Sequence, residues 1–236
     1  MTSSNFSFKV FNRLKWEARR FRSLFNKSFS QCGEDMIARF YLQQPKGFYI
    51  DIGAYHPKRI SNTYHFYLKG WSGINIDGSK KSVELFNKMR PNDVNLHCCV
   101  GLPKSTSTVD FYMFDIAELN TFNKKALPDI LKYHKQTPVA VEKIELHSLR
   151  NILDEHMPLD KNIDLLSIDA EGADEEILLS NNWDRYRPKV LIVEKHCSIY
   201  DFLNTNMHKF LIEKQYVLGG YSRHSYIFHD VAYNEF

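Results

Sequence analysis

Short apolar runs alternate along the chain with amphipathic segments of helical spacing. The apolar runs cover residues 48–52, 73–76, 163–168 and 190–193. Segments with apolar residues three and four positions apart follow at 64–70, 80–89, 173–179 and 199–213. Short strands that alternate with helices are typical of an α/β domain, so we expect a mostly parallel sheet with helices on both faces.

The remaining segments extend this pattern less regularly. We expect helices over 36–42 and 148–156 and a helix-like segment from residue 58, together with strands over 94–100, 109–114, 139–146, 216–218 and 226–229. Residues 115–138 show no clear period. A connection of this length in a compact domain is usually a functional loop or a disordered segment. We interpret it as a substrate lid.

The stretch GFYIDIGAYHP, residues 47–57, combines a strand with a tight turn of small residues. Ligands of open α/β sheets bind beyond the carboxyl ends of the strands. Gly53 and Ala54 would lie at that point, with Asp51 beside the ligand. The turn lacks the G-x-G-x-x-G of dinucleotide sites, which favours a nucleoside without a pyrophosphate. The same turn also occurs as a plain connection, so this stretch alone does not decide the function.

An acidic residue also closes the second strand. Asp77 lies 24 positions after Gly53, where α/β nucleotide folds hold the two ribose hydroxyls. Asp77, followed by Gly78 and Ser79, could equally cap the next helix. Its occurrence together with the turn at Gly53 favours the ribose role.

Two further strand ends carry polar groups that would meet in the same crevice. Asp169 and Glu171 follow the run at 163–168, and Glu194 and His196 follow the run at 190–193. Before the first helix, Gln31 could reach a ligand or belong to the helix cap. The sequence therefore predicts one polar site to which several strand ends contribute side chains.

Length and composition agree with a single folded domain. The 236 residues are 43% hydrophobic and 14% aromatic, with four cysteines that show no C-x-x-C spacing. No run of about 18 apolar residues and no signal-peptide pattern is present, so we expect a cytoplasmic location.

Charge divides the chain into an arm at 1–28 and a domain at 29–236. Seven of the 31 cations but one of the 28 anions lie between residues 9 and 27, which leaves 24 cations and 27 anions elsewhere. A slightly acidic body does not fit a nucleic-acid partner.

The arm predicts a basic amphipathic helix over residues 8–27. Its apolar face is formed by Phe11, Leu14, Ala18, Phe21 and Phe25. Such a helix could lie on the inner face of the membrane, or it could pack on the domain or on a second copy in a homodimer.

Four motifs occur in a fixed order between residues 29 and 193. They are Ser30-Gln31-x-Gly33-Glu34-Asp35, Asp51-Ile52-Gly53-Ala54, Gly73-Ile74-x-Ile76-Asp77 and Ile168-Asp169-x-Glu171-Gly172. In this combination the chain resembles the FkbM family of S-adenosylmethionine-dependent methyltransferases. The resemblance implies a class I methyltransferase fold, a Rossmann-like, mostly parallel seven-stranded sheet with one late antiparallel strand. It also implies a cofactor site, for which we expect Gln31, Asp51, Gly53, Ala54, Asp77, Gly78, Ser79 and Asp169.

The resemblance further implies methylation of a hydroxyl, many family members acting on sugars of surface glycans or on secondary metabolites. We therefore expect a nucleotide sugar or a glycan as substrate. A hydroxyl is a poor nucleophile, and the candidate catalytic groups are Asp169, Glu171 and His196. A divalent metal such as Mg2+ is an alternative, with Asp169 and Glu194, alone or together with Glu171, as oxygen ligands.

Two other function classes stay open at this point. One is a non-catalytic scaffold docked through the arm to a membrane or to a glycan-assembly enzyme. The other is a nicotinamide oxidoreductase, which the missing glycine fingerprint weakens.

Overall fold

The computed structural model describes residues 27–103 and 108–233. The basic helix predicted over 8–27 lies, apart from Lys27, outside the described residues. Within the described part, none of the helices has both the length and the apolar character needed to span a bilayer.

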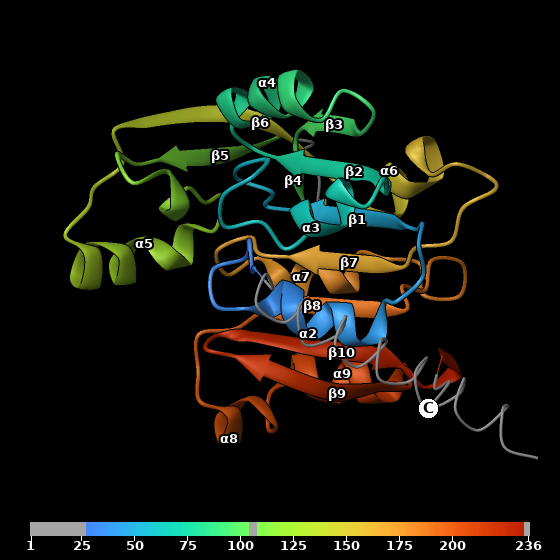
Figure 1. Cartoon of the computed structure of the whole chain (residues 1–236). Helices are drawn as coiled ribbons and strands as arrows, with labels where there is room; N and C mark the ends of the chain where they lie inside the picture. The colour runs from blue at the N-terminus through green and yellow to red at the C-terminus, as the bar shows by residue number, and fades with distance from the viewer. Residues whose placement is uncertain (1–26, 104–107, 234–236) are drawn as a thin grey trace, which may run out of the picture.

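A seven-stranded sheet forms the centre of the molecule (Figure 1). Its strands, in spatial order, are β3 (Val94–His97), β2 (Ser72–Asp77), β1 (Phe48–Ile52), β7 (Leu165–Ile168), β8 (Val190–Glu194), β10 (Ser225–Asp230) and β9 (Tyr216–Ser222). The first five run parallel, and β10 is antiparallel to both of its neighbours. This confirms the expected mostly parallel sheet with a late antiparallel strand.

Helices cover both faces of this sheet. In Figure 1, α2 (Glu34–Tyr41) and α3 (Tyr64–Leu68) lie in front of it, and α7 (Asp174–Leu179) and α9 (Asn206–Glu213) lie behind. The remaining helices of the domain body are α4 (Lys80–Met89), α6 (Leu149–His156), α8 (Ile199–Phe202) and the 3-10 turn η4 (Val231–Tyr233).

The two faces of β1 enter different clusters of apolar side chains. Phe48, Ile50 and Ile52 pack with side chains from α6, α7 and α9, whereas Tyr49 packs with side chains from α2 and α3. A strand covered on both faces is buried along its whole length, which is why its sequence reads as a continuous apolar run.

The strand predicted over 94–100 is in fact two strands. β3 ends at His97, opposite the last residue of β2, and the chain then leaves the main sheet. It continues as β4 (Cys99–Val100) in a second sheet of order β4-β6-β5, with β5 (Thr108–Met113) and β6 (Ala140–His147). Cys98 still packs in the main core, whereas Cys99 packs in a separate cluster of this second sheet.

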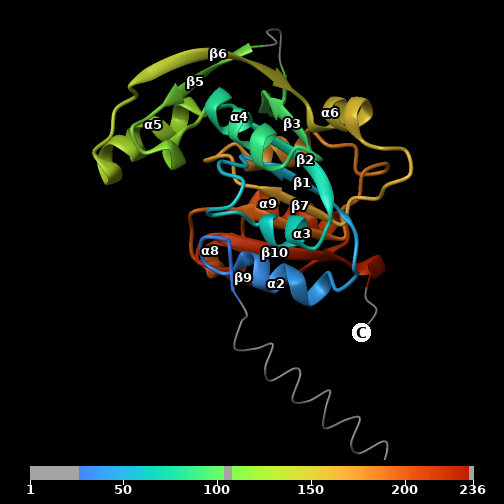
Figure 2. The same ribbon diagram turned by 45° about the horizontal axis from the view of Figure 1, so that its top comes forward.

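Residues 115–138 contain several short helical turns where the sequence predicts only a loop. They are η1 (Ala117–Leu119), η2 (Lys124–Ala126), α5 (Leu127–Asp129) and the π-helical turn η3 (Ile130–His134). A small cluster of Phe114, Leu119 and Ile130 holds them together. Figure 2 shows this segment beside β5 and β6, beyond the edge of the main sheet.

Of two predicted helices, one is absent from the structure and the other is divided into two. No helix begins at Lys58, because His56 accepts the backbone N–H groups of Lys58 and Arg59 in a turn and Ile60 adopts a positive φ. The helix predicted over 199–213 is broken into α8 and α9, because Thr205 is extended and its hydroxyl caps α9.

Candidate active site

A cavity of about 360 Å³ lies at the carboxyl ends of four neighbouring strands. Its lining includes Gly53 after β1, Asp77 at the end of β2, Asp169 after β7 and Glu194 at the end of β8. Residues 116–122 and His134 also line it, so the segment predicted as a lid borders the same space. The strand ends that the sequence singled out therefore do converge.

Asp77 is held in place by backbone groups while it faces the cavity. Its carboxylate accepts the N–H of Tyr55 at 2.8 Å and the N–H of Ser79 at 2.7 Å. Each oxygen keeps lone pairs for a ligand. Burial raises the pKa of Asp77 to about 6.

Gly78 and Ser79, the two residues after Asp77, differ in whether they border the cavity. Gly78 lines the cavity, and a Cβ there would lie 2.5 Å from the ring of Phe111. Ser79 is not among the lining residues, because its hydroxyl caps α4 by accepting the N–H of Ser82. The hydroxyl of Ser79 is thus engaged in a capping contact, and its expected cofactor contact stays a prediction.

A glycine is needed at position 53 because the loop after β7 crosses it at close range. Its φ is +72°, and a Cβ would lie 1.7 Å from the carbonyl oxygen of Asp169. The N–H of Gly53 donates to Ile76, and the N–H of Asp169 donates to Ile52. The glycine therefore lets the ends of β1, β2 and β7 come together beside the cavity, and its expected contact with a cofactor stays a prediction.

Asp51 and Ala54 do not line the cavity. The carboxylate of Asp51 accepts the hydroxyl hydrogen of Thr63 at 2.6 Å, and burial raises its pKa. Asp51 is the fourth residue of β1, so it lies inside the strand and not beyond its end. Ala54 is 3% exposed. The expected direct contacts of these two residues with the cofactor stay a prediction, since neither residue borders the cavity.

A buried arginine, which sequence reasoning missed, holds the loop after β1. Arg90 is fully buried and donates to the Pro57 carbonyl at 2.9 Å and to the hydroxyls of Ser61 and Thr63. Its guanidinium also stacks with the ring of Tyr67. The sequence carries no signal for this contact, because Arg90 follows a surface helix.

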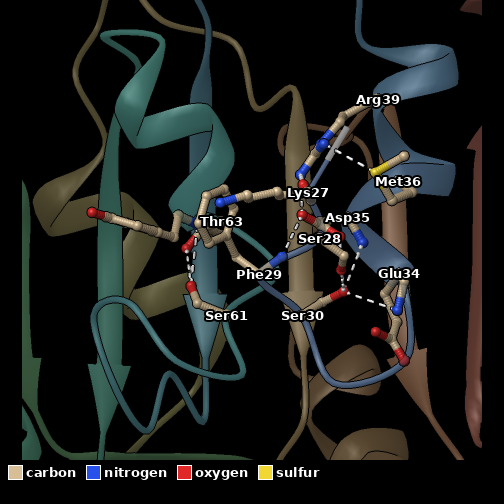
Figure 3. A network of polar contacts seen from close by, with 12 residues as sticks. Lys27, Ser28, Phe29, Ser30, Glu34, Asp35, Met36, Arg39, Ser61 and Thr63 are labelled. Atoms are coloured by element: carbon tan, nitrogen blue, oxygen red, sulfur yellow. Dashed lines mark hydrogen bonds and ion pairs between the residues drawn. The ribbon is translucent and has the colours of Figure 1, made fainter. Parts of the chain in front are cut away.

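Gln31 lines the cavity. Figure 3 shows the polar network that holds the neighbouring residues of its loop around Asp35. Ser28 and Ser30 donate to the carboxylate of Asp35 at 2.6 and 2.9 Å, and Arg39 forms an ion pair with the same carboxylate. Asp35 has no exposed surface. The predicted ligand position of Gln31 is compatible with this geometry.

Four acidic side chains gather at the ends of β7 and β8. Burial and the charge of Glu194 raise the pKa of Glu171 to about 8. The same two causes raise the pKa of Asp174 to about 7, and burial with the neighbouring carboxylates raises that of Asp169. Asp174 accepts the N–H groups of Ala170 and Gly172 and so shapes this loop. Asp174 is the first residue of α7, and an acidic residue in the first turn of a helix is the sequence signal that could have identified it.

His196 completes this acidic corner. Its Nε2 lies 3.2 Å from Oε1 of Glu194, and this hydrogen bond raises the pKa of His196. Burial is the largest influence on Glu194 and disfavours its charge, but the contacts with His196 and Asp169 and the charges of His196 and His224 together outweigh it and lower the pKa of Glu194. The ring of His196 also stacks on that of His224, with centroids 4.4 Å apart.

Comparison with known proteins identifies the family. The model of the methyltransferase FkbM domain matches residues 51–218. The chain belongs to this family. The FkbM domain begins at the strand residue Asp51 and includes all four strand ends of the cavity. The chain is therefore an S-adenosylmethionine-dependent methyltransferase with the class I fold, as its strand order shows.

Other comparisons add little to this identification. A TehB-like SAM-dependent methyltransferase from Corynebacterium glutamicum is 12% identical, with a TM-score of 0.40 over 92% of this chain and 97% of its own. A similarity this distant supports no conclusion about the FkbM domain. No curated protein matches the chain.

The cavity fits S-adenosylmethionine on two observations. Asp77 offers free carboxylate lone pairs at the strand end where α/β nucleotide folds hold ribose hydroxyls. The acidic side chains at Asp169 and Glu171 suit the positive sulfonium and ammonium groups of this cofactor. Three donor groups, those of Glu171, Glu194 and His196, also lie within 4.8 Å of one another, a spacing that could hold a metal ion.

Proposed function

We propose that this FkbM methyltransferase transfers a methyl group to a hydroxyl oxygen of a sugar. The observation that carries the proposal is the group of Asp169, Glu171 and His196, which lines the same cavity as Gly53 and Asp77. A hydroxyl needs a proton acceptor before it becomes a good nucleophile, and carboxylate and imidazole groups provide one.

The two halves of the cavity have separate tasks in this proposal. Asp77 holds the ribose hydroxyls, and Gly78 lets the ring of Phe111 pack against the backbone beside the nucleoside. Gln31 and Asp169 face the amino-acid end of the cofactor. Asp51, Ala54 and Ser79 act indirectly, by holding the loops that carry these groups.

S-adenosylmethionine supplies an electrophilic methyl group on its sulfonium sulfur. In the transfer the bond from methyl carbon to sulfur breaks, a bond to the acceptor oxygen forms, and the hydroxyl proton passes to a base. Asp169 is placed to take this proton, because its backbone crosses Gly53 while its carboxylate neighbours Glu194 and Glu171. Its raised pKa makes its ionised form a strong base, and the positive cofactor favours that form.

Glu171 and His196 orient the acceptor hydroxyl toward Asp169. Both line the cavity, and 63% of the His196 side chain is exposed, so it is accessible to a substrate. Correct alignment of the reacting atoms contributes a large part of the rate of such a displacement.

A sugar acceptor is supported by the polar side chains of the cavity and by the resemblance to sugar-modifying family members. Asn120 and His134 come from the segment interpreted as a lid, and their amide and imidazole groups offer hydrogen bonds to hydroxyls. A nucleotide sugar and a sugar residue of a surface glycan both present such groups.

The experiment is methyl transfer from cofactor labelled in its methyl group to a panel of nucleotide sugars and glycan fragments, read by mass spectrometry. The expected product carries the label on oxygen. Glu171→Gln and His196→Gln should retain cofactor binding and lower turnover by roughly 100-fold. Labelled nitrogen or carbon products would contradict hydroxyl transfer, and a protein that binds no cofactor would favour the scaffold function.

A further inference from the structure

We propose that Glu171, Glu194 and His196 form a binding site for a divalent transition-metal ion, for which Mn2+ is the probe. The inference deepens the proposed function and rests on it, because the ion would lie in the cavity where the acceptor hydroxyls bind. Its test measures metal binding directly and does not depend on methyl transfer.

The three donors come from two neighbouring strand ends. Glu171 is in the loop after β7, Glu194 is the last residue of β8, and His196 lies two residues further on. Their donor atoms are all within 4.8 Å of one another. Donors about 2.1 Å from a common ion lie roughly 3 to 4 Å apart, so a small rotation of the exposed His196 side chain closes the site.

Glu194 provides an independent reason to expect a ligand here. The residue is 8% exposed, and its Oε2 atom has no hydrogen-bond partner among the described residues. Its other carboxylate oxygen is the one that lies 3.2 Å from His196. A buried polar atom without a partner is costly, and a coordinated cation would satisfy it.

Among the described residues, no permanent cation is paired with the carboxylate of Glu194 or Glu171, although Arg223 also lines the cavity. No lysine or arginine among residues 27–103 and 108–233 forms an ion pair with Glu171 or Glu194. The competing occupant is a proton shared between Glu194 and Asp169, which lies within hydrogen-bonding reach. The experiment below distinguishes the two.

The donor set selects the kind of ion. Two carboxylates and one imidazole suit Mn2+, Fe2+ or Zn2+, whereas Mg2+ prefers oxygen ligands alone. This differs from the expectation of Mg2+ on Asp169 and Glu194. Three protein ligands on one side leave coordination positions open to the cavity, where two neighbouring hydroxyls of a sugar could bind.

The test is a titration of the metal-free full-length protein with Mn2+, followed by the electron paramagnetic resonance signal of the free ion. The wild type should bind one Mn2+ per chain, and Mg2+ should compete at least tenfold more weakly. His196→Gln is the principal variant, because its exposed side chain makes a folding defect unexpected. It should weaken Mn2+ binding at least tenfold, as should Glu171→Gln.

The chain contains a matched control in Glu145 and His147, a pair with the same two-residue spacing and a contact of 3.0 Å that lies outside the cavity. Glu145→Gln should leave Mn2+ binding unchanged. No Mn2+ binding by the wild type, or equal binding by His196→Gln, would overturn the metal site and favour the shared proton. Calorimetry of S-adenosylmethionine on the same samples keeps this failure separate from failure of the proposed function.

Discussion

A Cβ atom at position 53 would lie 1.7 Å from the carbonyl oxygen of Asp169. The contact joins the turn after β1 to the loop after β7, the two loops between which the cofactor half of the cavity meets the acidic corner. A backbone oxygen cannot move away as the end of a flexible side chain can. Gly53 therefore sets the geometry of both halves at once.

Gly53→Ala should lower the free energy of unfolding by more than about 3 kcal/mol and abolish cofactor binding, because the loop at Asp169 must shift. Chemical denaturation and calorimetry measure the two effects. Gly70→Ala is the control, since Gly70 also has a positive φ but no atom within 4 Å of its Cβ position. It should cost roughly 1 to 2 kcal/mol and retain binding. Equal effects of the two substitutions would refute the close-contact explanation.

Much of this arrangement could be predicted from local pattern. The apolar runs locate the parallel strands, and because parallel strands end at one edge, Asp77, Asp169 and Glu194 were expected to meet. Motif position alone could not show that Asp51 is buried and paired within the protein. It is inside β1, on the face opposite Ile50 and Ile52, where it meets Thr63.

The parts that were missed depend on contacts between distant segments. The break between His97 and Cys99 follows from pairing with β2 and then with β6, which no local period reports. Arg90 reaches a carbonyl 33 residues earlier in the chain. Hydrophobic periodicity records which face of an element is buried, and it does not record which polar groups meet inside.

Asp77→Asn should weaken binding of S-adenosylmethionine by roughly 10- to 100-fold, because the amide loses the charged acceptor for the ribose hydroxyls. The variant keeps the size of the side chain, so its unfolding transition should stay close to that of the wild type. Asp160→Asn, at a side chain 77% exposed outside the cavity, serves as the control and should bind normally. Unchanged affinity of Asp77→Asn would remove Asp77 from the ribose site.

Asp35→Ala should lower the free energy of unfolding by about 3 kcal/mol, because it leaves the guanidinium of Arg39, whose side chain is 11% exposed, without its partner. Thermal and chemical denaturation measure the loss. Asp110→Ala removes a surface partner of Lys143 and should have little effect. Similar small effects of both substitutions would show that the network around Asp35 does not stabilise the fold.

The stability of the cofactor-free protein should decrease as the pH rises from about 5 to about 8. The pKa of Glu171 is about 8 in the folded protein and lies at its ordinary lower value in the unfolded chain, so the unfolded state releases this proton first. Glu171 alone accounts for roughly 1.4 kcal/mol per pH unit in this window.

Glu171→Gln should therefore flatten the dependence of unfolding free energy on pH, as measured by denaturation at several pH values. Glu145→Gln, at a side chain 72% exposed, should leave the slope as in the wild type. A slope that stays the same in Glu171→Gln would show that Glu171 is not buried against its acidic neighbours in solution.

The most direct test of the central claim is calorimetric titration of the full chain with S-adenosylmethionine, S-adenosylhomocysteine and NAD. The cavity at the ends of β1, β2, β7 and β8 should bind the two sulfur compounds at one site per chain, in competition with each other, and should not bind NAD. Absence of binding by both sulfur compounds, or binding of NAD in their place, would contradict the account.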